Sequence, residues 1–173
     1  MHILAAEDNA INQKVLSRIL QKLPGCAVSF VSNGQEALDY LSAPPSTCPR
    51  PDIILMDLAM PVMAGYEAIS IIRTQQQFTS DPWIPTTPIV ALTASRARGE
   101  HERLLFRGFD DVLVKPTRQA DVRRAIMYWS TRRVVPRPNG PLAVSRMGNM
   151  IPIRPEAVWG PPLRNFRGPR SLL

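Results

Sequence analysis

The sequence predicts an α/β domain in which a doubly wound, parallel sheet of five strands is covered by helices on both faces. Short apolar runs alternate along the chain with longer segments of helical periodicity. The apolar run at residues 53–56 has no polar alternation, which is typical of a strand buried on both faces of a parallel sheet. Each crossover in such a sheet is right-handed and carries a helix that covers one face.

The five strands are short apolar segments, each followed by a turn or a helix start. The central strand ends abruptly in Asp57, and the loop after it contains Pro61 and Gly65. In chain order, the expected strands are residues 3–6, 27–31, 52–57, 89–92 and 112–114.

The helices between these strands are expected from apolar residues at helical spacing and from their caps. Asn9 is suited to capping the first helix, and Asn33-Gly34 forms the turn into the second. Pro24-Gly25 should end the first helix, and Gly108 the fourth. The apolar residues are, helix by helix, Val15, Leu16, Ile19, Leu20 and Leu23; Ala37, Leu38 and Leu41; Ala68, Ile69 and Ile72; Leu104, Leu105 and Phe106; and Val122, Ala125, Ile126 and Trp129.

Residues 74–88 form an unusually long, polar connection that contains proline and Trp83. We interpret this segment as a surface insertion rather than a functional site.

Polar residues stand where four of the strands end, at the carboxyl edge where parallel sheets bind ligands. Each has an ordinary explanation when judged singly, such as a helix cap or a solvated charge. Their coincidence at equivalent strand ends favours a functional site. The residues are Glu7 and Asp8 after the first strand, Asp57 after the third, Thr93 after the fourth and Lys115 after the fifth.

The composition is that of a globular protein, with 45% hydrophobic and 20% charged residues among 173. The net charge is +7, but residues 1–130 are balanced, so the basic excess lies in residues 131–173. That segment is rich in Pro, Arg and Gly, and we expect a disordered tail after a folded domain at 1–130. Its charge is a weak signal for nucleic acid, because no regularly spaced aromatic residues accompany it.

Cys26 and Cys48 have no metal-ligand spacing, and reduced thiols suit the cytosol. No stretch approaches the roughly 18–20 apolar residues of a membrane span, and no signal-peptide pattern begins the chain. We expect a cytoplasmic location, with membrane association only as part of a longer protein.

Several further motifs surround the strand ends. They are Glu7-Asp8-Asn9 with Asn12, Asn33-Gly34, Met56-Asp57 with Met60-Pro61 and Gly65, Ala91-Leu92-Thr93-Ala94, Gly108 with Asp110-Asp111, and Lys115-Pro116. Together they resemble the receiver (response regulatory) domain of two-component and phosphorelay systems over residues 2–130. Asn9 with Asn12, and Arg98-Gly99-Glu100, are most similar to receivers of hybrid histidine kinases. The resemblance implies the flavodoxin-like (βα)5 fold with strand order 2-1-3-4-5.

The three carboxylates repel one another, so the site should favour a hard divalent cation. The resemblance implies Mg²⁺, held by Asp8, Asp57 and the backbone carbonyl of Ala59, with Glu7 acting through water. It also implies that Asp57 is the phosphoacceptor. Thr93 and Lys115 would then contact the phosphoryl oxygens, and movement of Thr93 would be the switch.

The same resemblance implies a signalling phosphoacceptor rather than an enzyme, with only intrinsic phosphotransfer and slow autophosphatase chemistry. Its partner would be a histidine kinase or a histidine phosphotransfer protein. Lys115-Pro116 is expected to be cis, as in the family. Two positions depart from the pattern, Ala64 where the family often has Asp, and Val112 where it usually has an aromatic residue.

A second interpretation is a flavodoxin-like domain that binds a metal or a small ligand without phosphotransfer. It is less favoured because Ala10, Ile11 and Asn12 replace the glycine-rich phosphate loop after the first strand. A phosphatase of the haloacid-dehalogenase type would need a second Asp two residues after Asp57, where Ala59 stands.

Overall fold

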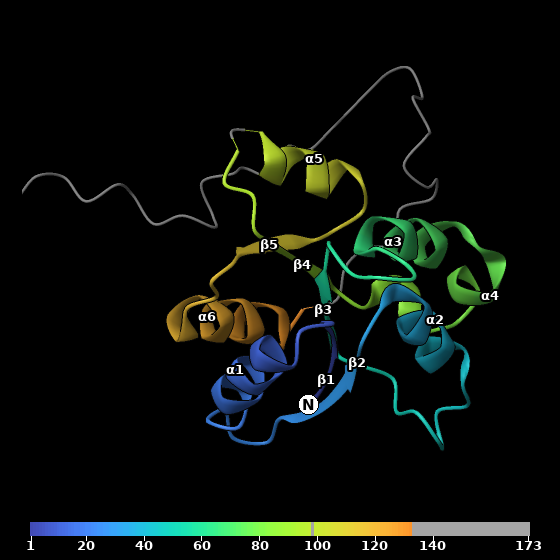
Figure 1. Cartoon of the computed structure of the whole chain (residues 1–173). Helices are drawn as coiled ribbons and strands as arrows, with labels where there is room; N and C mark the ends of the chain where they lie inside the picture. Colours follow the sequence, from blue (N-terminus) through green and yellow to red (C-terminus); the bar gives the residue numbers. More distant parts are fainter. Residues whose placement is uncertain (98, 133–173) are drawn as a thin grey trace, which may run out of the picture. The chain divides into compact units, whose positions relative to one another are not determined.

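The computed structural model describes residues 1–97 and 99–132. Its five strands form one parallel sheet in the order β2-β1-β3-β4-β5 (Figure 1). The fold class and the strand order predicted from the sequence are confirmed. The predicted disorder of the tail falls mainly on residues 133–173, outside the described residues. The strands are β1 (His2–Ala6), β2 (Ala27–Val31), β3 (Ile53–Asp57), β4 (Ile89–Thr93) and β5 (Asp111–Val114).

Helices cover both faces of this sheet. One apolar cluster joins the sheet to α1 and α6, and the other joins it to α2, α3, α4 and α5. In Figure 1, α1 and α6 accordingly lie together, apart from α2, α3 and α4. The helices are α1 (Ala10–Leu20), α2 (Gly34–Ser42), α3 (Gly65–Thr74), α4 (Gln76–Thr79), α5 (Glu100–Phe106) and α6 (Gln119–Trp129), with a 3-10 helix at Ile84–Thr86.

Strand β3 is buried along its whole length, as its unbroken apolar sequence predicts. Its residues alternate between the two faces of the sheet, so Ile54 and Met56 join the cluster under α2 and α3. Ile53 and Leu55 join the cluster under α1 and α6. Full burial of one such side chain stabilises the fold by about 1.5–3 kcal/mol, and β3 therefore anchors Asp57 on a rigid element.

Asparagine side chains fix the turns that lead from β1 and β2 into the helices. Asn9 Oδ1 accepts hydrogen bonds from the backbone N–H of Ile11 (2.9 Å) and Asn12 (3.2 Å). Asn33 Oδ1 accepts the N–H of Glu36 at 2.8 Å. The predicted cap at Asn9 is confirmed, and the structure adds a cap at Asn33; both satisfy N–H groups that would otherwise lack a partner at a helix start.

Not every apolar residue at helical spacing is buried. Val15 on α1 is 42% exposed and Phe106 on α5 is 70% exposed. Helix α5 has only seven residues, and Leu104 is its buried residue. Phe109, just beyond this helix, is fully buried although the periodicity did not single it out.

The segment 74–88 corrects the interpretation as a surface insertion. It forms α4 and the 3-10 helix, and Phe78 and Ile84 from these elements are buried in the core. An ion pair of 2.9 Å between Arg50 and Asp81 ties it to the loop before β3. The expectation holds for Trp83, which is 52% exposed, and for the exposed polar residues around Phe78. The buried position of Phe78 was not predicted because the residues on either side of it in the sequence are polar.

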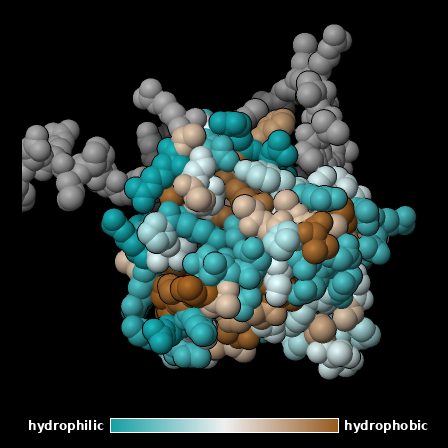
Figure 2. All heavy atoms as spheres, viewed as in Figure 1, coloured by the Kyte–Doolittle hydropathy of each residue, from teal (hydrophilic) through white to brown (hydrophobic). Residues whose placement is uncertain are grey.

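Within residues 1–97 and 99–132, no helix combines the length and the apolar content that a bilayer crossing requires. Figure 2 shows hydrophobic residues in separate patches among hydrophilic surface on the face that it displays.

Candidate functional site

The parallel sheet brings the predicted site residues to one edge. Residues Glu7 and Asp8 follow β1, Asp57 ends β3 and Thr93 ends β4. Strand β3 lies between β1 and β4, and Lys115 follows β5 on the far side of β4. Because all pairs are parallel, these residues share the carboxyl edge of the sheet.

Three carboxylates from two strands converge at this edge. Glu7, Asp8 and Asp57 each offer an oxygen, and these atoms all lie within 4.8 Å of one another. Glu7 is fully buried and Asp57 is 5% exposed, whereas Asp8 is exposed to solvent. Such a set of carboxylate oxygens suits a hard divalent cation, because the cation offsets their mutual repulsion.

Lys115 supplies the positive charge of the site. Its Nζ donates to Glu7 Oε2 at 2.6 Å and to Asp57 Oδ2 at 2.5 Å. Burial lowers the pKa of Lys115, but the hydrogen bonds and charges of Asp57 and Glu7 outweigh burial and leave the pKa above its ordinary value. The lysine is therefore a fixed ammonium ion between two carboxylates.

The loop after β3 fixes the second oxygen of Asp57. Asp57 Oδ1 accepts the backbone N–H of Ala59 at 3.1 Å, so the carboxylate is held from both sides. Gly65 N donates to Leu58 O at 3.3 Å, which brings the start of α3 against the end of β3. A Cβ atom at Gly65 would lie 2.2 Å from the carbonyl oxygen of Asp57, and only glycine allows this approach.

Thr93 is connected to the site through the backbone and the β4–α5 loop. Its carbonyl oxygen accepts the N–H of Lys115 at 2.7 Å. Its hydroxyl is almost buried and accepts the N–H of Ser95 at 3.0 Å. An accepting hydroxyl keeps its own hydrogen for donation, so Thr93 retains a donor near the end of β4.

The peptide bond between Lys115 and Pro116 is cis, which confirms the prediction for this turn. Val112 is partly buried and packs against the core cluster under α2 and α3. Ala64 precedes α3 without a side-chain cap, because alanine has no hydrogen-bonding group there.

Sequence reasoning gave no separate role to two amide side chains on α1. Asn12 Nδ2 donates to Glu7 Oε1 at 2.8 Å, and Gln13 Nε2 donates to the backbone carbonyl of Glu7 at 2.6 Å. In the sequence, Asn12 stands out only as part of the Glu7-Asp8-Asn9 motif. Its spacing of five residues from Glu7, across a strand-to-helix turn, is the only sequence feature that indicates their contact.

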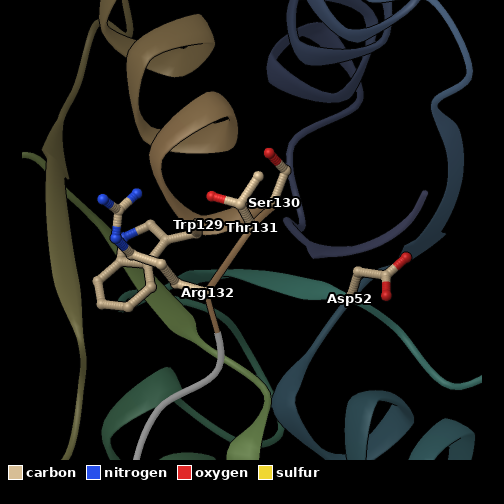
Figure 3. Close-up of a pocket in the computed structure, with 5 residues that line it drawn as sticks. All are labelled: Asp52, Trp129, Ser130, Thr131 and Arg132. Atoms are coloured by element: carbon tan, nitrogen blue, oxygen red, sulfur yellow. The ribbon is translucent and has the colours of Figure 1, made fainter.

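The structure also contains a cavity of about 210 Å³ away from this site. Figure 3 shows its lining, which comes from Trp129 at the end of α6, from Ser130, Thr131 and Arg132 after it, and from Asp52 before β3. Asp52 precedes the first residue of β3, whereas Asp57 is the last. The cavity therefore lies at the amino edge of the sheet, and none of the strand-end residues lines it.

With this geometry in place, comparison with known proteins defines the class. Residues 3–127 match the family model of the response regulator receiver domain. The chain belongs to this family, and it is a receiver domain of two-component and phosphorelay proteins. Receiver domains are signalling phosphoacceptors and are generally not classed as enzymes.

Individual relatives agree with this class. The chain is 35% identical over 114 residues to hybrid signal transduction histidine kinase I of Dictyostelium discoideum, covering 66% of this chain and 6% of that protein. It is 29% identical over 134 residues to the two-component response regulator ARR3 of Arabidopsis thaliana, covering 74% and 55%. The chain thus spans less than two thirds of either relative.

Among solved structures, a receiver domain of a sensor histidine kinase of Pseudomonas aeruginosa is similar at 36% identity and a TM-score of 0.61. The likeness covers 75% of this chain and 96% of that one. That structure has a magnesium ion coordinated in its active-site cleft.

Proposed function

We propose that this chain accepts a phosphoryl group on Asp57 from a phosphohistidine donor in a Mg²⁺-dependent reaction. The observation that supports this most directly is the double contact of Lys115 with Asp57 Oδ2 and Glu7 Oε2 at the carboxyl edge of the sheet. The ammonium of Lys115 thus lies beside the carboxylate of Asp57, which is hydrogen-bonded and 5% exposed to solvent. A carboxylate in this position is a suitable oxygen nucleophile.

The residues at the site fit a magnesium ion, because they supply several oxygen ligands close together. We assign Asp8, Asp57 and the backbone carbonyl of Ala59 as its ligands, with Glu7 acting through water. When bound, the ion neutralises carboxylate and phosphoryl charge.

The transfer exchanges one bond to phosphorus for another. An oxygen of Asp57 bonds to phosphorus as the bond between phosphorus and the donor imidazole nitrogen breaks, and an acyl phosphate forms. The ammonium of Lys115 stabilises charge on the phosphoryl oxygens, and the Thr93 hydroxyl donates to one of them. Because Thr93 then gains a phosphoryl partner while its hydroxyl is bonded to Ser95 of the β4–α5 loop, that loop carries the switch. Slow hydrolysis of the acyl phosphate at the same site returns the domain to its resting state.

The donor is a histidine kinase or a histidine phosphotransfer protein. Exposed apolar residues flank the site on both sides and support docking of a protein rather than a small molecule. Ile11, next to Asn12 on α1, is 71% exposed, and Val62, in the loop after Asp57, is 84% exposed.

We assign the receiver to residues 1–130 in the cytoplasm, and residues 131–173 to a basic tail.

The test is labelling with acetyl phosphate, or with a phosphorylated histidine donor, in the presence of Mg²⁺. We expect one phosphoryl group on the wild-type chain, located at Asp57 by peptide mass spectrometry. Asp57→Asn should abolish the label, because an amide is a poor nucleophile. Asp39→Asn, on an exposed position of α2, is the matched control and should be labelled normally. Full labelling of Asp57→Asn would overturn the assignment.

A flavodoxin-like domain that only binds a metal or ligand would take no phosphoryl group in this experiment. The wild-type chain would then bind Mg²⁺ and remain unlabelled.

A further inference from the structure

The buried carboxylate of Glu7 has a separate partner for each of its oxygens. Oε2 accepts at 2.6 Å from Lys115, the lysine that also donates to Asp57 Oδ2. Oε1 accepts from Asn12 Nδ2 at 2.8 Å and from the backbone N–H of Asn9 at 3.3 Å. Because a carboxylate only accepts hydrogen bonds, the Asn12 amide must present its NH₂ group to Glu7.

The arrangement departs from the usual start of a helix. Asn9 is the N-cap of α1 and Asn12 is the third helical residue, whose side chain often reaches back to the N–H of the cap residue. Here Glu7 takes the N–H of Asn9, and the Asn12 side chain is used on Glu7 instead. The backbone N–H of Asn12 still donates to the cap at 3.2 Å. The first turn of α1 is thus tied to the acidic site by a side chain that the helix itself does not need.

We propose that Asn12 is a positioning residue of the phosphoacceptor site, which fixes Glu7 Oε1 so that Oε2 stays turned toward Lys115 and the metal. The proposal rests on the proposed function of this site and adds a residue to it. Without the Asn12 donor, Oε1 keeps only the longer 3.3 Å contact with the Asn9 N–H, and the carboxylate can rotate about its last bond and exchange its two oxygens. Glu7 would then spend part of its time with neither oxygen aligned for the Lys115 ammonium and the site that would hold the metal.

Substitution Asn12→Ala removes the amide and keeps a good helix former at that position. Loss of a side chain that orients a metal-site carboxylate typically costs 10–100-fold in metal affinity or activity. We expect Mg²⁺, titrated alone into the protein in a calorimeter, to bind about 10-fold or more weakly. The labelling rate with acetyl phosphate should fall at low Mg²⁺ and recover largely at saturating Mg²⁺.

Gln13→Ala is the matched control. Gln13 is the next residue on the same helix, carries the same kind of amide and contacts the same Glu7, but through its backbone carbonyl. Gln13→Ala should leave the Mg²⁺ affinity within about twofold of wild type. Asn12→Gln, which keeps an amide donor, should restore part of the affinity lost in Asn12→Ala.

Melting in the presence of EDTA separates positioning from folding. Asn12→Ala should melt no lower than Gln13→Ala while binding Mg²⁺ more weakly. Equal Mg²⁺ affinity in Asn12→Ala and wild type, or equal weakening in both alanine variants, would refute the positioning role. Absence of label on wild-type Asp57 would instead refute the proposed function, and the Mg²⁺ titrations would still decide the role of Asn12.

Discussion

Gly65 shows how a single residue supports the site without any polar group of its own. A Cβ atom there would lie 2.2 Å from the Asp57 carbonyl oxygen and 3.0 Å from the Met56 side chain. The strand end and the start of α3 must therefore separate if the residue is enlarged. Because Asp57 belongs to that strand end, its position depends on this contact.

We predict that Gly65→Ala lowers the free energy of unfolding by about 1–3 kcal/mol, since overpacking of backbone against Cβ has no flexible side chain to relieve it. It should also slow labelling of Asp57. Denaturant unfolding and the acetyl phosphate assay measure the two effects. Gly25→Ala is the comparison, because no atom lies within 4 Å of its Cβ. Its left-handed φ of 72° should cost about 1 kcal/mol without slowing labelling. Wild-type stability in Gly65→Ala would contradict this account.

At the level of elements, the segment that contains α4 is held by apolar and ionic contacts together. Phe78 and Ile84 lie in the core, and Asp81 between them accepts the N–H groups of Trp83 (2.8 Å) and Ile84 (3.1 Å). Arg50 pairs with Asp81 and also donates to the carbonyl of Leu41 at 2.7 Å. Asp81 thus connects this segment to the loop before β3.

The pKa of Asp81 gives a prediction of acid sensitivity. Burial raises this pKa, but the N–H groups of Trp83 and Ile84 and the charge of Arg50 outweigh it and leave the pKa below its ordinary value. A lowered folded-state pKa stabilises the fold above the unfolded pKa of about 3.9, and this contribution is lost as the pH falls through the folded value.

Asp81→Asn should therefore destabilise the protein by roughly 1–3 kcal/mol at pH 7 and flatten the loss of stability below about pH 4. Urea unfolding between pH 3 and pH 7 measures both effects. Asp121→Asn, which removes the exposed pair with Arg124, is the control and should change stability by less than about 1 kcal/mol. The idea fails if Asp81→Asn and wild type lose stability in parallel down to pH 3.

Strand β5 carries the departure at Val112, which bears on how phosphorylation is transmitted. Valine is stiff at χ1 and lacks the ring and hydroxyl of the aromatic residue usual at this position. We predict that phosphorylation alters the surface around Val112 only modestly, as suits a receiver that relays phosphate. Amide chemical shifts on addition of beryllofluoride and Mg²⁺ test this, the fluoride complex standing in for the phosphoryl group.

Shifts around Val112 and α5 should be small beside those at Asp57 and Thr93. Val112→Tyr restores the aromatic side chain and should enlarge the response of α5. Wild-type shifts around Val112 as large as those at the site would contradict the relay interpretation.

At the level of the whole molecule, the two apolar clusters seen among residues 1–97 and 99–132 are built by residues that precede Ser130. Within this described part of the chain, the contributor nearest the tail is Trp129 on α6, whose indole N–H donates to Asp111 Oδ2 at 3.1 Å. Deletion of residues 131–173 should therefore leave the melting temperature and the labelling of Asp57 near their wild-type values. Calorimetry of the truncated and full chains measures the first. A drop in melting temperature of many degrees would show that the tail contributes to the fold.

The sequence by itself determined the strands, their parallel arrangement and the edge on which the site lies. Uninterrupted apolar runs specify strands buried on both faces, and a parallel sheet must bring their carboxyl ends together. The helix starts after Asn9 and after the Asn33-Gly34 turn could also be predicted, because a capping bond or a turn involves only a few neighbouring residues. Local chemistry sufficed for each of these features.

Only the tertiary structure decided which of these residues touch. Lys115 and Glu7 are separated by 108 positions in the chain, and their contact depends on packing of the whole sheet. The burial of Phe78 and the contact of Asn12 with Glu7 likewise depend on neighbours that no local pattern specifies. Local propensities act over a few residues, whereas the side-chain contacts of a site are fixed only when distant elements pack.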